Sequence, residues 1–335
     1  MKKMLVVSIA ALAVSASFAQ ELSWQQLVRS KEFWPAECTL KKPLEFQSGK
    51  GVRAGQKLSI LDIQATQVEA GALGMGFAVK PEDTDCLAVA RASYAALTPA
   101  QREMTYASIL ARKELWPYRV ALTEPIELGS PDGVLPPGHQ VVLLDVAKRT
   151  GKLTLINERT RTGFDLEAEA TDLLAQLRKA VVDGPPSRMA AEMEGRLVNA
   201  ATDAPASLDP NALPRYYLLY RGGGWCPYTR KLTPDVVKFY NEMHPKHPEF
   251  EAIYLPVDKS AAALQAYAKE AAFPWPSVSF QRSKDLKIIA SLLAPIPQLI
   301  VVDSTGKLVI DDSTQASQDV LTKLKGLLTQ TAQSR

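Results

Sequence analysis

The sequence is poor in residues that bind metals and has no phosphate-binding glycine motif. Its 335 residues include three cysteines and three histidines. The histidines, His139, His244 and His247, are not paired with cysteines at the spacing of a zinc site. The run Gly222-Gly223-Gly224 lacks the Lys and the Ser or Thr of a P-loop. We therefore expect neither a metal nor a cofactor.

The chain also lacks a strong net charge. The formal net charge of +3 includes Lys2 and Lys3, which lie in a segment that we expect to be removed. Such a balance leaves no electrostatic footprint for nucleic acid or for a membrane surface. We expect neither kind of partner.

A long apolar run near the N-terminus is missing too, because the stretch at residues 4–14 is too short to span a bilayer. It follows a basic start and precedes the small-x-small site Ser17-Phe18-Ala19, a combination typical of a secretory signal peptide over residues 1–19. An ordinary N-terminal helix is the alternative. The segment looks bacterial, so we expect cleavage near Ala19 and a secreted or periplasmic protein. A periplasm is oxidising and favours bonds between neighbouring cysteines.

What the sequence does contain, first, is an internal duplication. With 46% hydrophobic and 22% charged residues, the chain is typical of a soluble globular protein of two or three domains. Between residues 34 and 180, short segments recur in one order at nearly constant spacing. The matched segments are Trp34-Pro35 with Trp116-Pro117, Pro43-Leu44-Glu45 with Pro125-Ile126-Glu127, residues 58–63 with 141–146, Gly76-Phe77 with Gly163-Phe164, and Thr84-Asp85 with Thr171-Asp172. So many ordered matches indicate a repeated structural unit.

Each repeat has the pattern of short strands closed by one helix. An edge strand near Pro43 or Pro125 is followed by a glycine turn and an alternating strand. Thr84 or Thr171 then caps the helix, and the whole predicts a small barrel. We place the first repeat at residues 20–112 and the second at 113–182. Residues 183–212, rich in Ala and Pro, are expected to be a partly helical linker.

The third cysteine lies where a strand meets a helix. Residues 216–220 are an apolar run with the length of a buried strand, and the three glycines end it. An amphipathic helical pattern starts after Cys226. The first turn of a helix has unpaired N–H groups and a positive dipole end, which favour the thiolate, the nucleophilic form of cysteine. Three basic residues have the same effect if they lie near the sulfur: Arg221, Arg230 and Lys231.

This part of the sequence resembles the thioredoxin fold, and most closely its nucleoredoxin- and tryparedoxin-like branch. The matching pieces are Trp225 to Arg230, Phe239-Tyr240, residues 250–254, Asp258, Phe273-Pro274-Trp275-Pro276, residues 296–303 and Gly306-Lys307. The resemblance implies an α/β thioredoxin-like domain at residues 213–335. It implies that Pro297, after Ile296, is a cis-proline facing Cys226. It also implies that Trp225, Pro227 and Tyr228 support the site, while Trp275 either lines the groove beside Cys226 or belongs to the core.

The sequence departs from that family at Thr229, where the family carries a second cysteine. The strand before Cys226 also contains no Asp or Glu, so the buried carboxylate of thioredoxin proper has no counterpart there. Dithiol chemistry within the motif is excluded. A single thiolate still attacks a disulfide and forms a mixed disulfide, which an external thiol then resolves. The Thr229 hydroxyl, one turn along, is positioned to hydrogen-bond the sulfur.

The repeats resemble, more weakly, the bacterial SH3-like barrels that occur in pairs ahead of a thioredoxin-like domain in some secreted proteins. The expected architecture is therefore multidomain: two small SH3-like β-barrels followed by the α/β domain. One interpretation is an exported monothiol oxidoreductase or isomerase-like enzyme, whose partners are protein thiols or disulfides and a thiol reductant. Peroxide reduction uses the same thiolate. The alternative is a non-catalytic periplasmic adaptor, whose barrels bind a protein or cell-wall ligand.

Cys38 and Cys86 give the last prediction. Their counterparts in the second repeat are Val120 and Leu173, both apolar, so both cysteines are expected to point into the first repeat's core. Two separate buried thiols are one interpretation, because free cysteine packs like a small hydrophobe. The other is a Cys38–Cys86 disulfide, which an oxidising compartment favours if the Cα atoms lie within about 7 Å. Cys226 itself is predicted to be solvent-accessible and more acidic than an ordinary thiol.

Overall fold

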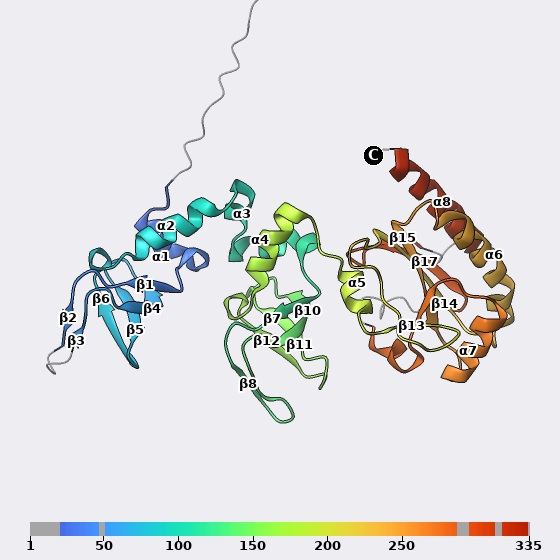
Figure 1. Ribbon diagram of the computed structural model, residues 1–335, viewed down its shortest axis with the longest axis horizontal. Helices are drawn as coiled ribbons and strands as arrows, with labels where there is room; N and C mark the ends of the chain where they lie inside the picture. Colours follow the sequence, from blue (N-terminus) through green and yellow to red (C-terminus); the bar gives the residue numbers. More distant parts are fainter. Residues whose placement is uncertain (1–20, 47–50, 287–294, 312–316, 334–335) are drawn as a thin grey trace, which may run out of the picture. The chain divides into compact units, whose positions relative to one another are not determined.

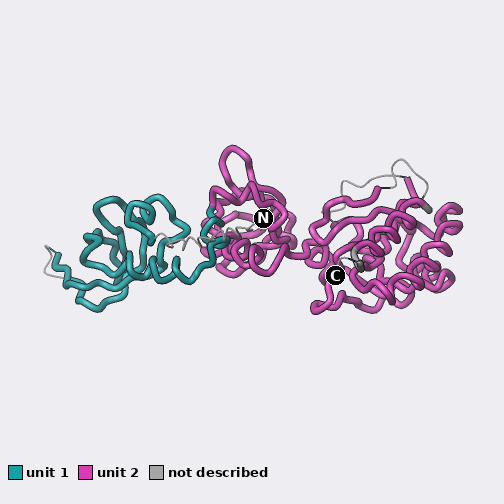
Figure 2. The backbone as a smooth tube through the Cα atoms, turned by 90° about the horizontal axis from the view of Figure 1, so that it is seen from above, with its two compact units in different colours: residues 1–105 teal, residues 106–335 magenta. Residues whose placement is uncertain are grey.

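The computed structural model describes residues 21–46, 51–286, 295–311 and 317–333 (Figure 1). The expected signal peptide, residues 1–19, lies outside the described residues. The chain divides into two compact units, residues 1–105 and 106–335 (Figure 2). Within the described ranges, no helix has both the length and the apolar character needed to cross a membrane.

The first unit contains the first repeat. Its antiparallel sheet has the strand order β1-β4-β5-β6, and β2 and β3 form a separate two-stranded ribbon. The elements are α1 (Trp24–Arg29), η1 (Lys31–Phe33), β1 (Glu37–Thr39), β2 (Leu44–Glu45), β3 (Gly51–Val52), β4 (Lys57–Ile63), β5 (Val68–Ala72), β6 (Met75–Val79), η2 (Pro81–Asp83), α2 (Cys86–Ala96) and α3 (Pro99–Glu103). The apolar core lies between the sheet and α2 and includes Leu27, Leu58 and Val68.

The second repeat opens the second unit with the same plan. Its sheet has the order β12-β11-β10-β7, and β8 and β9 form the ribbon. The elements are η3 (Tyr106–Leu115), β7 (Arg119–Ala121), β8 (Ile126–Gly129), β9 (Gly133–Leu135), β10 (Gln140–Val146), β11 (Leu153–Ile156), β12 (Gly163–Leu166), η4 (Ala168–Ala170) and α4 (Leu173–Asp183). The helical lead-in η3 occupies the place in this repeat that α1 and η1 occupy in the first.

Two expectations about the repeats change in the structure. In the residues described for each repeat, the four-stranded sheet and the ribbon are separate and no closed barrel forms. The N-cap residues of α2 and α4 are Asp85 and Asp172, one position after the threonines. The Thr84 and Thr171 hydroxyls instead accept the first backbone N–H of each helix, at 3.3 Å.

The C-terminal domain is built on a six-stranded mixed sheet of order β13-β16-β15-β14-β17-β18. Central β14 runs parallel to β15 and antiparallel to β17. The strands are β13 (Leu197–Asn199), β14 (Tyr216–Gly222), β15 (Phe250–Pro256), β16 (Pro276–Val278), β17 (Gln298–Asp303) and β18 (Leu308–Ile310), with α5 (Arg188–Met193), α6 (Pro227–Met243), α7 (Ala261–Glu270), η5 (Phe280–Asp285) and α8 (Ser317–Gln333). Because both faces of β14 are covered, its sequence is a continuous apolar run.

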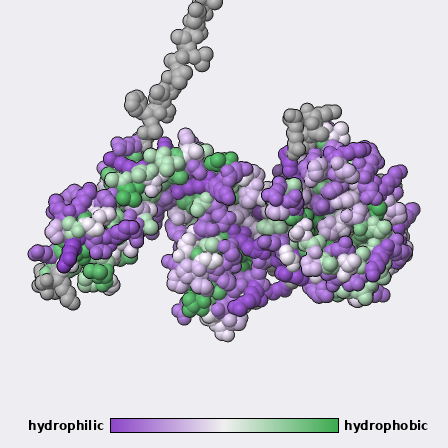
Figure 3. Space-filling model, viewed as in Figure 1, coloured by the Kyte–Doolittle hydropathy of each residue, from purple (hydrophilic) through white to green (hydrophobic). Residues whose placement is uncertain are grey.

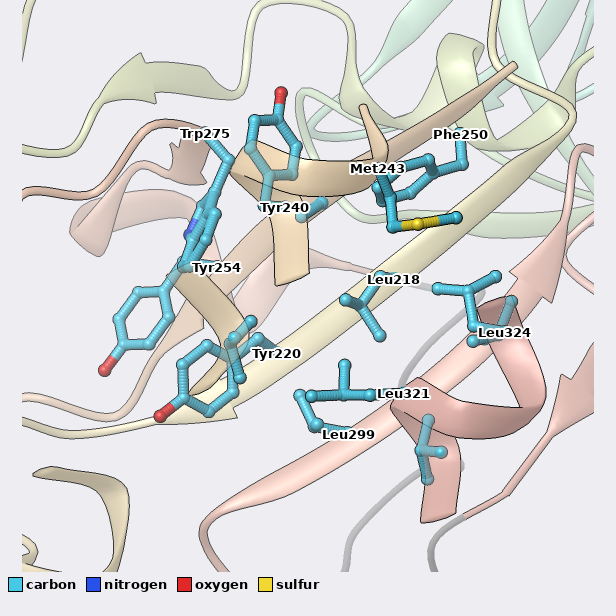
Figure 4. Packing of buried hydrophobic residues seen from close by; sticks show 14 of the residues in the cluster. Leu218, Tyr220, Tyr240, Met243, Phe250, Tyr254, Trp275, Leu299, Leu321 and Leu324 are labelled. Carbon is cyan, nitrogen blue, oxygen red and sulfur yellow. The ribbon is translucent and has the colours of Figure 1, made fainter. Parts of the chain in front are cut away.

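The two faces of β14 belong to different parts of the core. Leu218 and Tyr220 pack in a cluster that includes residues of α6 and α8, and Figure 4 shows Leu218 near Leu324 of α8. Tyr217 and Leu219 pack in a second cluster with Met189 and Met193 of α5. Both clusters anchor the strand that ends just before Cys226.

The segment expected to be a linker contributes to this domain. Residues 183–212 contain α5 and β13, and β13 pairs with β16 at the edge of the sheet. The prediction of a linker rested on the Ala- and Pro-rich composition of this segment. The apolar side chains of Met189, Met193 and Leu197 decide otherwise, because each is buried against the sheet.

Candidate active site

The backbone places Cys226 at the junction of β14 and α6. Cys226 is the N-cap residue of α6, with φ −88° and ψ 119°, and Pro227 follows in the first turn. The glycines before it allow a tight approach: a side-chain carbon on Gly223 would lie 2.6 Å from the Trp225 indole, and one on Gly224 would lie 2.6 Å from the Tyr267 ring. The strand–turn–helix arrangement predicted from the sequence is present.

The Cys226 sulfur is less open than expected. The residue is 5% exposed, which contradicts the prediction of a solvent-accessible thiol. Its Sγ lies 3.9 Å from the Ile296 carbonyl oxygen, and the Ile296–Pro297 peptide has the cis form that the resemblance implied. The loop before β17 therefore covers the sulfur.

Two large aromatic side chains beside the buried sulfur are open to solvent. Trp225 is 55% exposed and Tyr228 is 73% exposed. The Trp225 indole N–H donates to the Val257 carbonyl at 3.0 Å, which fixes the ring while leaving most of it uncovered. The site thus presents an aromatic rim around a recessed thiol.

The electrostatics of Cys226 favour the thiolate. Burial raises the pKa of the thiol, but hydrogen bonds from the backbone N–H of Thr229, the Thr229 hydroxyl and the backbone N–H of Tyr228 bring it below the ordinary value. These N–H groups are the unpaired donors of the first helical turn. Arg230 does not add to this effect, because its guanidinium donates to the Gly224 carbonyl and pairs with Glu270.

Thr229 occupies a buried position against the preceding strand. It is fully buried, and a side-chain carbon on Gly222 would lie 2.7 Å from its Cγ2. Within the part of the chain that the structure describes, the Thr229 hydroxyl has no regular hydrogen-bond partner. Its interaction with the Cys226 sulfur lowers the pKa of that thiol.

A buried carboxylate is present, although not in the strand where thioredoxin proper has it. Asp258, in the loop after β15, is 7% exposed and accepts the Gly224 N–H at 2.7 Å. Burial raises the pKa of this carboxyl. Asp258 comes near Cys226 because β14 and β15 are parallel neighbours, so the residues that follow each strand meet at one edge of the sheet. Its position just after a predicted strand was the indication that the sequence offered.

Trp275 belongs to the core rather than to the groove. It is 3% exposed, and its ring lies edge-on to Tyr240 at 5.5 Å and to Tyr220 at 6.4 Å (Figure 4). The two histidines of this domain contact neighbouring side chains: His244 stacks on Tyr240 at 4.5 Å, and His247 Nδ1 lies 3.3 Å from a carboxylate oxygen of Glu249. In the described ranges, no group of three or more His, Cys, Asp or Glu side chains is arranged to hold a metal ion.

The other two cysteines lie in the first unit. Cys38 and Cys86 are buried free thiols in the structure. A side-chain hydrogen bond between them lowers the pKa of Cys38 and raises that of Cys86.

Comparison with known proteins concerns the C-terminal domain alone. Residues 214–308 match the family described as thioredoxin-like. The chain is 32% identical over 93 residues to probable nucleoredoxin 1 of Arabidopsis thaliana, covering 27% of this chain and 16% of that protein. It is 30% identical over 95 residues to nucleoredoxin of Mus musculus, covering 27% of this chain and 21% of that protein. The match therefore spans about a fifth or less of each relative's length.

Among solved structures, the chain is similar to thioredoxin from Wuchereria bancrofti, with 28% identity, a TM-score of 0.32 and coverage of 39% of this chain and 94% of that one. It is also similar to tryparedoxin I from Leishmania major, with 26% identity, a TM-score of 0.32 and coverage of 40% and 90%. From the family match and the sequence relatives, the C-terminal region contains a thioredoxin-like domain related to nucleoredoxin.

Proposed function

We propose that this thioredoxin-like domain is a monothiol thiol–disulfide oxidoreductase that acts through Cys226. The observation that carries the proposal is the sulfur's position at the first turn of α6, where the N–H groups of Tyr228 and Thr229 lower the thiol pKa. The cis Pro297 peptide beside it and the exposed rings of Trp225 and Tyr228 support a site for another chain's sulfur.

The proposed first step is thiol–disulfide exchange on a protein disulfide. The Cys226 thiolate attacks one sulfur, a new S–S bond forms to Cys226, and the other sulfur leaves as a thiolate that takes a proton from water. The backbone N–H donors of Tyr228 and Thr229 hold the negative charge on the sulfur before the attack. The aromatic rim supplies apolar contact for the partner chain.

The second step requires a thiol from outside the motif, because Thr229 stands where a resolving cysteine would be. An external thiol attacks the mixed disulfide, Cys226 leaves as the thiolate, and the partner is released bound to the incoming sulfur. Because no second cysteine of the motif can attack the mixed disulfide, the partner remains attached until such a thiol arrives.

Our proposal includes export, with the repeats as SH3-like modules that hold a protein or cell-wall ligand near the thiol. One observation favours a second candidate, a periplasmic adaptor without turnover: Cys226 is 5% exposed. A buried thiol without access is inert. Reactivity of Cys226 in the folded protein separates the two functions.

The test is the alkylation rate of Cys226 against pH in the folded full-length mature chain. We expect the rate to reach half its maximum below pH about 8.5, the ordinary thiol value, since the rate follows the thiolate fraction. Thr229→Val keeps the shape and removes the hydroxyl, so it should move the midpoint upward. Cys226→Ser is the control for labelling at Cys38 and Cys86.

Trapping completes the experiment. Cys226 should retain protein partners as mixed disulfides, and Thr229→Cys, which restores a second thiol, should release them. If Cys226 alkylates no faster than a free peptide cysteine at neutral pH and retains no partner, the oxidoreductase proposal fails and the adaptor takes its place.

A further inference from the structure

Two cysteines of the first repeat lie in one apolar core and are not needed for the chemistry at Cys226. Cys38 is the central residue of β1 and Cys86 is the first residue of α2. They are 3% and 0% exposed, and both belong to the cluster that fills this repeat. The structure joins their thiols by a side-chain hydrogen bond.

The backbone on both sides of the two cysteines is hydrogen-bonded together. The Asp85 N–H donates to the Thr39 carbonyl at 3.1 Å, and the Thr39 N–H donates to the Asp85 carboxylate. Leu40 pairs with Thr84 in an isolated antiparallel bridge. The residue after Cys38 is thus bonded to the residue before Cys86, which fixes β1 beside the start of α2. A disulfide needs two cysteines on backbone segments held together in this way.

The second repeat shows that this geometry does not depend on sulfur. Val120 and Leu173 fill the equivalent positions, and both are fully buried. The same hydrogen bonds join β7 to the start of α4: the Ala121 N–H donates to the Asp172 carboxylate at 2.8 Å, and the Asp172 N–H donates to the Ala121 carbonyl at 3.0 Å. The same hydrogen-bonded arrangement therefore forms in the second repeat with two apolar side chains in place of the cysteines.

The first repeat also has more to gain from a covalent link. α2 buries Cys86 and Ala90, whereas α4 buries Leu173, Leu174, Leu177 and Ala180. A helix with a smaller apolar face is held less firmly against its sheet. A bond at the first residue of α2 would tie that helix to β1.

From this arrangement we infer that Cys38 and Cys86 form a second thiol–disulfide site, independent of Cys226, whose oxidation locks α2 onto β1. The oxidant is a low-molecular-weight disulfide or an exposed protein disulfide. The Cys38 thiolate attacks it and expels one thiolate; Cys86, losing its proton, then attacks the Cys38 sulfur and expels the second. Two cysteine thiols become one disulfide, and the external disulfide becomes two thiols that carry the two protons.

The site differs from Cys226 in access and in effect. Neither sulfur is exposed, so exchange requires β1 and α2 to separate for a moment. Once formed, the bond opposes that separation, because a cross-link limits the freedom of the opened chain. It is therefore a bond that changes the stability of the first repeat.

The test uses the mature full-length chain carrying Cys226→Ser, equilibrated with oxidised glutathione or with reduced dithiothreitol. We expect peptide mapping to find Cys38 linked to Cys86 in the first sample alone. We expect amide hydrogen exchange in α2 to slow on oxidation by about tenfold or more. The matched control, Cys38→Val with Cys86→Leu, has the residues found at the equivalent positions of the second repeat. It should show the same hydrogen exchange in α2 in both samples.

Two results would overturn the inference. One is that both cysteines alkylate as free thiols on unfolding after exposure to oxidised glutathione. The other is a Cys38–Cys86 bond that leaves exchange in α2 unchanged. The mapping is read on the chain with native Cys38 and Cys86, so it decides the question even if the control variant does not fold. Because Cys226 is absent throughout, failure here leaves the proposed activity of Cys226 standing.

Discussion

The two repeats share a hydrogen-bonding skeleton and differ in how completely they are buried. In the first, the Trp34 indole N–H donates to the Leu27 carbonyl at 2.7 Å; in the second, the Trp116 indole N–H donates to Ile109 at 2.9 Å. A lysine ammonium lies over each ring, Lys31 at 5.6 Å and Lys113 at 5.0 Å. Equivalent sequence positions in the two repeats thus make equivalent contacts.

The second repeat has further contacts with the C-terminal domain of the same unit. In the second repeat, Tyr118, Val142 and Ile156 of the sheet region pack with Ala191 of α5. The Arg188 guanidinium at the start of α5 donates to the carbonyls of Pro117 and Leu143, at 3.1 and 3.2 Å. These contacts join the second repeat to the C-terminal domain. They add to the contacts that the second repeat makes within its own sheet and helix.

An ion cluster strengthens this junction. The Glu158 carboxylate accepts from Arg119 and from Arg196, which is 3% exposed. Burial raises the pKa of Glu158, but the two guanidinium groups bring it below its ordinary value. Hydrogen-bonded charge partners of this kind keep a partly buried carboxylate ionised.

The largest predicted effect is a difference in the free energy of unfolding when the equivalent tryptophans of the two repeats, Trp34 and Trp116, are removed. Trp116→Ala should lower the free energy of unfolding of its unit by about 3–5 kcal/mol, the usual cost of removing a fully buried aromatic side chain. Trp34→Ala should cost less, because Trp34 is half-buried and Trp116 is 1% exposed. Urea unfolding, followed separately for each unit by hydrogen exchange, measures both values.

The conservative variants Trp116→Phe and Trp34→Phe serve as controls that retain the ring and remove the N–H donor. Equal losses for the two alanine variants would contradict the expectation that the more deeply buried tryptophan contributes more to stability.

An intermediate effect tests what the repeats share. Asp85→Ala and Asp172→Ala each remove the carboxylate that accepts a strand N–H, from Thr39 and from Ala121. Leaving such a donor unpaired costs about 1–3 kcal/mol, so we expect similar losses in the two units. Unfolding free energies of the two variants are compared directly. Asp→Asn at either site retains an acceptor and should recover most of the lost stability. A large loss in one repeat alone would show that the two aspartate hydrogen bonds do not contribute equally.

The smallest effect concerns the leucines at the β-bulges of β4 and β10. Leu61 is 61% exposed and Leu144 is 40% exposed. The face of the molecule in Figure 3 is mostly hydrophilic, with apolar patches over both repeats. Leu61→Ser should change stability by no more than about 0.5 kcal/mol, as exposed substitutions usually do.

Leu144→Ser should cost slightly more than its counterpart, because Leu144 lines a cavity of about 540 Å³ with Thr305 and Gly306 of the C-terminal domain. Thermal unfolding of the two variants against the wild type measures the difference. A loss above about 1 kcal/mol for Leu61→Ser would identify Leu61 as a packing residue instead of a surface one.

Several features of this protein were determined by the sequence alone. The ordered matches established the duplication, and the apolar run 216–220 followed by glycines and a 3.6-residue period placed Cys226 at a strand–helix junction. The family resemblance supplied the cis Pro297. These features were readable because strand, turn and helix preferences act over a few neighbouring residues.

Tertiary structure decided what depends on residues far apart in the chain. The Ile296 carbonyl covers the Cys226 sulfur, and Asp258 supplies the buried carboxylate that the preceding strand lacks. Met189 and Leu197 turned an expected linker into part of the sheet. In the described residues of each repeat, a four-stranded sheet and a separate ribbon stand where a barrel was predicted. Burial and electrostatic environment are properties of the packed chain, because they depend on which distant segments meet, and no local pattern records that.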